Sequence, residues 1–212
     1  MRVWKWDQET RRFPWPWGWR ILVLVAVAVT VGLAHPAMAL PATADELELP
    51  AETPDEFFAA AYRKHMAGDL NEAIALYRQS IARKPTAPGY TFLGWAYAHQ
   101  GRVDEAIAEC EKAIAIDPEY GNPWNDIGSY LTSKGELNRA VPFLKRATKA
   151  KRYCCPHFPH LNLGRLYAAQ RKYQDAKREF ERVLELVPGY PPAIISLKIL
   201  EALMAQEVEE SI

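Results

Sequence analysis

The chain carries an internal repeat with a period close to 34 residues, and this feature limits its possible folds more than any other. Three glycines lie 33 and 34 residues apart, each followed five residues later by an alanine: Gly68 with Ala73, Gly101 with Ala106, and Gly135 with Ala140. In a fourth unit, Arg171 takes the glycine position and Ala176 the alanine position. Units of one repeat adopt the same structure and pack against their neighbours. The sequence therefore predicts a stacked array.

Each unit has the pattern of two helices. In the second unit, four residues with i, i+3, i+4 and i+7 spacing would share one helix face: Tyr90, Leu93, Gly94 and Tyr97. Ala106, Cys110 and Ala113 form a similar face on a second helix. The glycine between them permits a turn with positive φ, and Pro118 cannot continue the second helix. One such pair cannot bury its apolar face alone, so we predict an all-α solenoid of stacked antiparallel pairs.

This pattern resembles the tetratricopeptide repeat family over residues 54–190, with four units in phase at about 54–86, 87–120, 121–153 and 157–190. Residues 191–206 are predicted to form a capping helix, and residues 207–212 an acidic tail. In the capping helix, the residues expected to pack are Ile194, Ile195, Leu197, Ile199, Leu200 and Leu203. The resemblance implies a right-handed superhelix and a non-catalytic scaffold that binds other proteins.

The resemblance also implies a concave groove lined by the first helix of each pair. Carried over position by position, the expected groove residues are Tyr62, His65, Trp95, His99, Asn125, Ser129, Asn162 and Arg165. The wider lining includes Phe58, Phe92, Asn122, Asp126 and Phe158. Some relatives bind acidic C-termini through a Lys and an Asn, but Phe58 and Tyr62 occupy those positions here. We expect a protein or peptide ligand held by aromatic surface at one end and by amides and Arg165 at the other.

Residues 1–39 have the pattern of a secretory signal peptide. Residues 1–20 contain five basic and two acidic residues, followed by an uncharged run from Ile21 to Ala34 and then by Ala37-Met38-Ala39. We predict cleavage after Ala39, a flexible acidic lead-in over residues 40–53, and a periplasmic or other extracytoplasmic location. The alternative is an uncleaved anchor in the inner membrane with its tryptophans at the interface, although the run is shorter than the roughly 20 apolar residues that a span requires.

The sequence contains none of the common catalytic motifs. A Gly-rich phosphate loop, H-E-x-x-H, G-x-S-x-G and C-x-x-C are all missing, so we predict no enzyme activity and no cofactor. One segment between the third and fourth units offers other chemistry, through the candidate metal ligands Cys154, Cys155, His157 and His160. The two cysteines are also a candidate redox pair. The alternative interpretation is a stiff linker shaped by Pro156 and Pro159, in which His160 takes a packing position.

The formal net charge is zero, but the charges are unevenly distributed. Residues 40–126 contain seven basic and fifteen acidic residues, whereas residues 134–182 contain thirteen basic and four acidic ones. The basic face of units three and four would attract an anionic partner. Nucleic acid is not expected for an exported protein. A further alternative is a structural repeat protein that self-assembles end to end, basic units meeting acidic ones.

Overall fold

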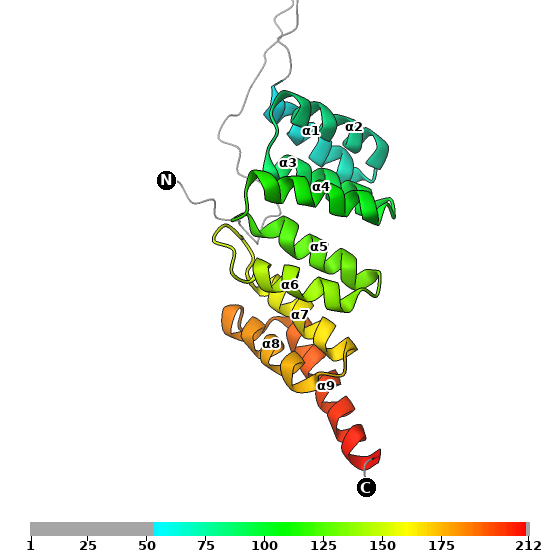
Figure 1. The fold of residues 1–212 in the computed structure, drawn as a ribbon, viewed down its shortest axis with the longest axis vertical. Coiled ribbons are helices and arrows are strands. Elements are labelled where there is room, and N and C mark those ends of the chain that lie inside the picture. The colour runs from blue at the N-terminus through cyan, green and yellow to red at the C-terminus, as the bar shows by residue number, and fades with distance from the viewer. Residues whose placement is uncertain (1–52, 211–212) are drawn as a thin grey trace, which may run out of the picture. The chain divides into compact units, whose positions relative to one another are not determined.

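The computed structural model describes residues 53–210; the predicted signal peptide, the lead-in up to Glu52 and the last two residues lie outside this range. The described residues form nine α-helices and no strand (Figure 1). Their bounds are α1 Pro54–Ala67, α2 Leu70–Arg83, α3 Ala87–His99, α4 Val103–Ile116, α5 Gly121–Ser133, α6 Leu137–Ala147, α7 His157–Ala169, α8 Tyr173–Leu186 and α9 Pro191–Glu210. The predicted all-α solenoid is confirmed.

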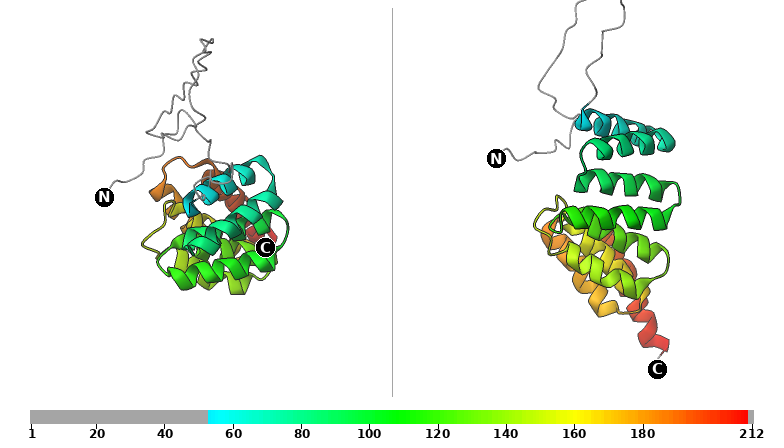
Figure 2. Two further views of the ribbon diagram at one scale, coloured as in Figure 1. Left: turned by 90° about the horizontal axis from the view of Figure 1, so that it is seen from above. Right: turned by 45° about the horizontal axis from the view of Figure 1, so that its top comes forward.

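The helices pack as successive pairs. α1 packs against α2, α3 against α4, α5 against α6 and α7 against α8, and the second helix of each pair also contacts the next first helix. Figures 1 and 2 show the pairs following one another in chain order. The first helices also contact each other in series, from α1 through α3, α5 and α7 to α9. This row of first helices is the surface on which the groove was expected.

The turn inside each pair has one conformation in all four units. Gly68, Gly101 and Gly135 have φ values of 88°, 77° and 78°, and Arg171 adopts φ 58° at the same position. The residue after each donates its amide to a carbonyl five residues earlier, at 2.9 Å in every unit: Asp69 to Lys64, Arg102 to Tyr97, Glu136 to Leu131 and Lys172 to Tyr167. A left-handed backbone costs a non-glycine residue about 1 kcal/mol. The turn therefore keeps its geometry even where glycine is missing.

The small residues of the repeat permit close helix packing. A Cβ atom on Gly128 would lie 2.5 Å from the Leu144 side chain, and one on Gly164 would lie 2.5 Å from the Phe180 ring. Four alanines on the second helices are fully buried: Ala73, Ala106, Ala140 and Ala176. Two clusters of buried residues, one in units one and two and one extending from unit two to α9, are joined through Tyr130. The core therefore continues along the stack.

The third pair departs from the repeat. α6 has 11 residues, whereas α2, α4 and α8 have 14 each. Residues 148–156, here called the connecting segment, run beside the loop between α4 and α5. Arg152 donates its amide to the Glu119 carbonyl at 3.0 Å, and its own carbonyl accepts from the Gly121 amide at 2.9 Å. The Arg152 guanidinium also pairs with Asp117. The residues inserted before the fourth unit thus form a connection that is held by hydrogen bonds and an ion pair to the loop at the end of the second unit.

The last helix packs with only one part of its apolar surface. Ala193 and Leu200 are buried, and Leu197 and Met204 pack against the core from partly buried positions. The expectation that Ile195, Ile199 and Leu203 also pack is wrong, because 57%, 57% and 37% of their surfaces are exposed. Their i, i+4, i+8 spacing places them on one face of α9, where no following helix covers them within residues 53–210. Within residues 53–210, none of the helices has the length and hydrophobicity needed to span a lipid bilayer.

Candidate peptide-binding groove

The first two units present a cluster of aromatic rings along α1 and α3. Phe58 and Tyr62 on α1 both contact Phe92 on α3, with ring centroids 5.2 and 5.8 Å apart, and Phe92 contacts Trp95 at 5.7 Å. These contacts are edge-to-face, one of the arrangements that aromatic pairs favour. Tyr62 is exposed and Trp95 is half-buried. The cluster therefore joins the two helices and also presents aromatic surface to solvent.

Two histidines lie beside this cluster. His65 Nε2 on α1 is 2.9 Å from His99 Nδ1 on α3, and the ring centroids of His65 and Trp95 are 4.3 Å apart. Burial, with a smaller contribution from His99, lowers the pKa of His65 to about 4, so its ring is neutral at pH 7. His65 is only 3% exposed, whereas His99 is exposed. Of this predicted groove pair, His99 faces solvent and His65 lies beneath it.

The last two units present a polar surface on α5 and α7. The Asn162 amide donates to Asn125 Oδ1 at 2.9 Å, and the Asn125 amide lies 3.4 Å from Asp126 Oδ1. The two asparagines expected to face a ligand separately are thus hydrogen-bonded to each other between the first helices of the third and fourth pairs. Ser129 and Arg165 are exposed. This end of the groove combines a pre-oriented amide pair with an exposed guanidinium.

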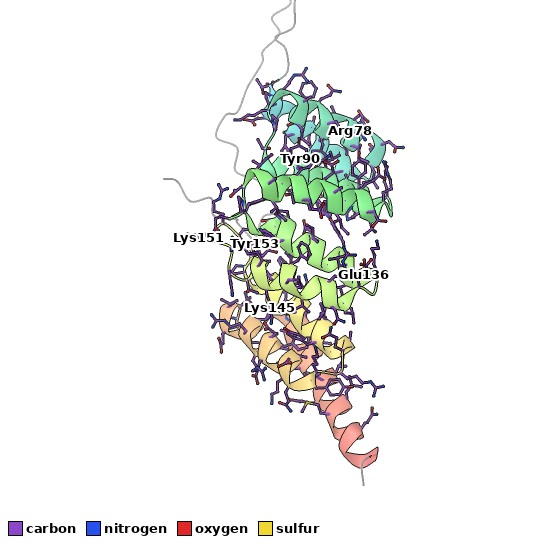
Figure 3. The ribbon with its side chains drawn as sticks, in the orientation of Figure 1. Arg78, Tyr90, Glu136, Lys145, Lys151 and Tyr153 are labelled. Atoms are coloured by element: carbon purple, nitrogen blue, oxygen red, sulfur yellow. The ribbon has the colours of Figure 1, made fainter. Side chains whose placement is uncertain are left out.

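A cavity of about 340 Å³ lies where the aromatic and polar surfaces meet. It is lined by Thr91, Phe92, Trp95, Asn122, Asn125, Asp126, Tyr153, Cys154, Cys155 and Phe158. These residues come from α3, α5, α7 and the connecting segment, on which Figure 3 labels Lys151 and Tyr153. The sequence indicated the helical part of this lining, but it gave no sign that Tyr153 and the cysteines belong to the groove. They lie there because the connecting segment turns back toward the loop between α4 and α5.

Asp126 is the acidic residue of the cavity lining. Burial raises the pKa of its carboxyl group to about 7, opposed only by the hydrogen bond from Asn125, and no cation of the described residues contributes to its charge balance. An isolated carboxylate in such a place is costly unless a charge partner arrives. Asp126 was expected in the wider lining because of its position in the repeat. Its lack of a charge partner among the described residues was not predictable, because that depends on which side chains surround the carboxyl group in the folded protein.

The candidate metal ligands of the connecting segment and the start of α7 do not converge. Cys154 Sγ and Cys155 Sγ lie 3.0 Å apart, but His157 packs on Phe158 and Tyr190, with centroid distances of 4.3 and 5.0 Å. His160 Nδ1 lies 2.7 Å from Glu179 Oε2. Among residues 53–210, no group of three or more His, Cys, Asp or Glu side chains is placed to hold a metal ion. Burial raises the pKa of Cys155 to about 12.

The basic surface of units three and four is partly neutralised. Arg146 pairs with Glu119 at 2.6 Å, and Arg152 pairs with Asp117, so two of its cations face the acidic loop between α4 and α5. On α8, Arg178 pairs with Asp175, and Lys177 lies 3.9 Å from Glu181. Figure 3 labels Lys145 on α6 and Lys151 on the connecting segment. The sequence therefore overstated the charge that this surface offers to a partner.

The chain matches three models of the tetratricopeptide repeat family, over residues 58–121, 122–154 and 157–190, and it belongs to that family. The family fold is that of a protein–protein interaction scaffold. A curated relative, the TPR repeat-containing thioredoxin TTL4 of Arabidopsis thaliana, is 36% identical over 80 residues, which are 37% of this chain and 11% of the relative. The chain spans between a tenth and a quarter of the length of the curated relatives it matches.

Two solved structures share the fold. The structure of pilF from Pseudomonas aeruginosa superimposes with a TM-score of 0.68 and 21% identity, covering 73% of this chain and 70% of that one. PilW, described as a widely conserved type IV pilus biogenesis factor, gives a TM-score of 0.67 and 21% identity, covering 72% of this chain and 70% of that one. At this identity the likeness shows the fold alone.

Proposed function

We propose that the protein is a non-catalytic adaptor that holds an extended segment of a partner protein in the groove formed by α1, α3, α5 and α7. The observation that carries the proposal is the cavity of about 340 Å³, which lies between the exposed aromatic surface of α1 and α3 and the amide pair of α5 and α7. Its lining combines four aromatic side chains with polar groups, and ligand sites are commonly built from apolar and aromatic walls with a few convergent polar groups.

The two ends of the groove have different tasks in this proposal. Tyr62 and Trp95 offer flat surface with few rotatable bonds, so a ligand side chain can pack there at low entropic cost. Asn162 is already oriented by its bond to Asn125, which reduces the entropy lost when it contacts a peptide backbone. Arg165 is exposed on α7 and can hold a carboxylate of the partner.

We also propose that the adaptor works in the cell envelope. The support lies in the basic start, the apolar run and the small residues before Leu40, all of which fall outside the described residues. PilW, which shares the fold, is described as a pilus biogenesis factor. Mass spectrometry of the protein purified from the exporting cell tests this proposal: a chain that begins at Leu40 supports it, and a chain that begins at Met1 in the cytoplasmic fraction refutes it.

Affinity capture from membrane extracts tests the groove. The bait is the full chain, in the wild-type form and as Trp95→Ala with Asn125→Ala. The matched control is Ile199→Ala, which truncates an exposed side chain on α9 that does not line the cavity. All three baits should give the same helical circular dichroism spectrum. We expect the wild type and the control to recover one set of proteins that the double variant loses, and equal recovery by all three would refute the groove.

A second candidate function is redox sensing by Cys154 and Cys155, whose sulfur atoms lie 3.0 Å apart in the cavity lining. Oxidation would form a bond between the two sulfurs and transfer two electrons and two protons to a disulfide oxidant, whose sulfur–sulfur bond breaks to give two thiols. Burial raises the pKa of Cys155 to about 12, which keeps that thiol protonated at pH 7. Treatment with oxidised glutathione followed by thiol titration tests this: the loss of two titratable thiols supports it, and two thiols that persist refute it.

A further inference from the structure

The cavity combines a carboxylate with aromatic walls. Phe92 and Trp95 come from α3, Tyr153 from the connecting segment and Phe158 from α7, while Asp126 contributes its carboxyl group from α5. The negative face of an aromatic ring attracts a cation, most strongly where water is excluded. A carboxylate beside several rings is therefore a site for a positively charged group. At about 340 Å³ the cavity is near the small end of the range for organic ligand sites, which suits one side chain.

Within residues 53–210, no titratable group around Asp126 supplies a positive charge. The groups whose pKa responds to its charge are Cys110 on α4, Tyr120 in the loop before α5, Tyr130 on α5, and Tyr153 on the connecting segment. Burial raises the pKa of each, and the Asp126 charge raises it further, so all four are neutral at pH 7. Cys155 is neutral as well, while α3 and α7 contribute Thr91, Phe92, Trp95 and Phe158 to the lining. The carboxyl group therefore has no counter-ion among the residues that the structure describes.

We propose that the cavity binds a lysine or arginine side chain of the partner segment, with Asp126 as its counter-ion and Phe92, Trp95, Tyr153 and Phe158 as its walls. The inference rests on the proposed groove function, because the basic side chain belongs to the segment held there. Asn122 and Asn125 belong to the same lining, and an amide oxygen can accept a hydrogen bond from a cation. A segment with an acidic side chain at this position would be repelled.

Proton linkage gives this site a characteristic pH dependence. In the free protein the Asp126 carboxyl is protonated in part of the molecules at pH 7, because its pKa is raised to about 7. A bound cation favours the carboxylate and lowers that pKa, so binding releases a proton when the pH is near or below 7. The affinity for a basic segment should therefore rise from pH 6 to pH 8. A peptide that is held by the aromatic surface alone would not show this change.

A selection from a random peptide library displayed on phage tests the proposal, with the full wild-type chain as bait at pH 8. One selected peptide is then synthesised with its enriched basic residue and with uncharged norleucine at that position. Isothermal titration measures both peptides against the wild type and Asp126→Asn, which keeps the shape of the carboxyl group. Asp175→Asn on α8 serves as the matched control for the loss of one acidic residue.

We expect the selection to enrich lysine or arginine at one register position. Replacing that residue with norleucine should weaken binding to the wild type and to the control about tenfold or more, as expected for a desolvated charge pair with aromatic walls. The same replacement should change binding to Asp126→Asn less than threefold or so, because the counter-ion is gone. Equal losses for all three proteins, or selected peptides without a basic residue, would overturn the inference.

Variants at the aromatic wall separate this inference from the groove proposal. Peptides that lack a basic residue but lose affinity for Trp95→Ala would leave the groove in place and remove only the role of Asp126. Peptides whose affinity is unchanged by both Trp95→Ala and Asn125→Ala bind elsewhere, and that outcome would refute the groove and the cation site together.

Discussion

His65 makes part of the stability of this protein dependent on pH. Its ring is buried between α1 and α3, and its pKa is lowered from 6.5 to about 4 in the folded state. Between these values the unfolded chain binds a proton that the folded chain excludes, so the free energy of unfolding falls as the pH falls from about 6.5 to 4. We expect a loss on the order of 2 kcal/mol over this window.

Urea denaturation at pH 6.5 and pH 4.5 measures this loss in the wild type and in His65→Gln. The variant keeps a hydrogen-bonding side chain but has no group that titrates there. Its stability should change less over the window than that of the wild type, while all other groups contribute equally to both proteins. The same pH dependence in the two proteins would contradict the assignment to His65.

Asp126 makes the protein less stable as the pH rises, whereas His65 makes it less stable as the pH falls. Its carboxyl pKa is raised from 3.8 to about 7, so the folded chain holds a proton that the unfolded chain releases between those values. The free energy of unfolding therefore falls as the pH rises through this window. We expect Asp126→Asn to be more stable than the wild type at pH 8, by on the order of 1–3 kcal/mol, and equally stable at pH 4. Thermal unfolding at both pH values checks this, and a variant that is less stable at pH 8 would contradict it.

α9 has one face that packs in the core and another that is exposed to solvent. It packs on α8 in the manner of the first helix of another pair, yet Ile199 is 57% exposed while the adjacent Leu200 is 2% exposed. We expect Leu200→Ala to lower the free energy of unfolding by about 2–5 kcal/mol, as for other buried leucines. Ile199→Ser should change it by no more than about 0.5 kcal/mol. Urea denaturation distinguishes the two variants. A large loss of stability in Ile199→Ser would mean that another surface covers the exposed face formed by Ile195, Ile199 and Leu203.

At the scale of the whole stack, residues 54–126 contain seven basic and eleven acidic residues, whereas residues 134–182 contain thirteen basic and four acidic ones, so units one and two are negatively charged and units three and four are positively charged. Ends of opposite charge attract over roughly 10 Å at 0.1 M salt and much less at 1 M. If the array assembles end to end, the mass measured by light scattering should exceed 24.1 kDa at low salt and decrease as salt is added. Lys145→Glu should weaken that assembly at low salt. A mass that does not depend on salt would exclude assembly driven by charge.

The sequence predicted the repeated part of the molecule well because that part is governed by local rules. Spacing along one helix face identified buried residues such as Ala106 and Leu131, and the turn position held its left-handed conformation even at Arg171. Each of these features depends on residues within one unit and its nearest neighbour. A repeat makes them visible several times, so agreement among units supports each assignment.

The sequence alone determined the family, the helix pairs, the turns and the row of first helices on which we propose a groove. The tertiary structure alone decided what that groove contains. It placed His65 beneath His99, joined Asn125 to Asn162, and brought Tyr153, Cys154 and Cys155 over the α5 surface beside Asp126. These features depend on contacts between residues far apart in the chain, and on the short α6 that lets the connecting segment turn back. Periodicity records which face of a helix is buried, but the partners that surround a polar side chain on the open face are set only when the pairs have stacked.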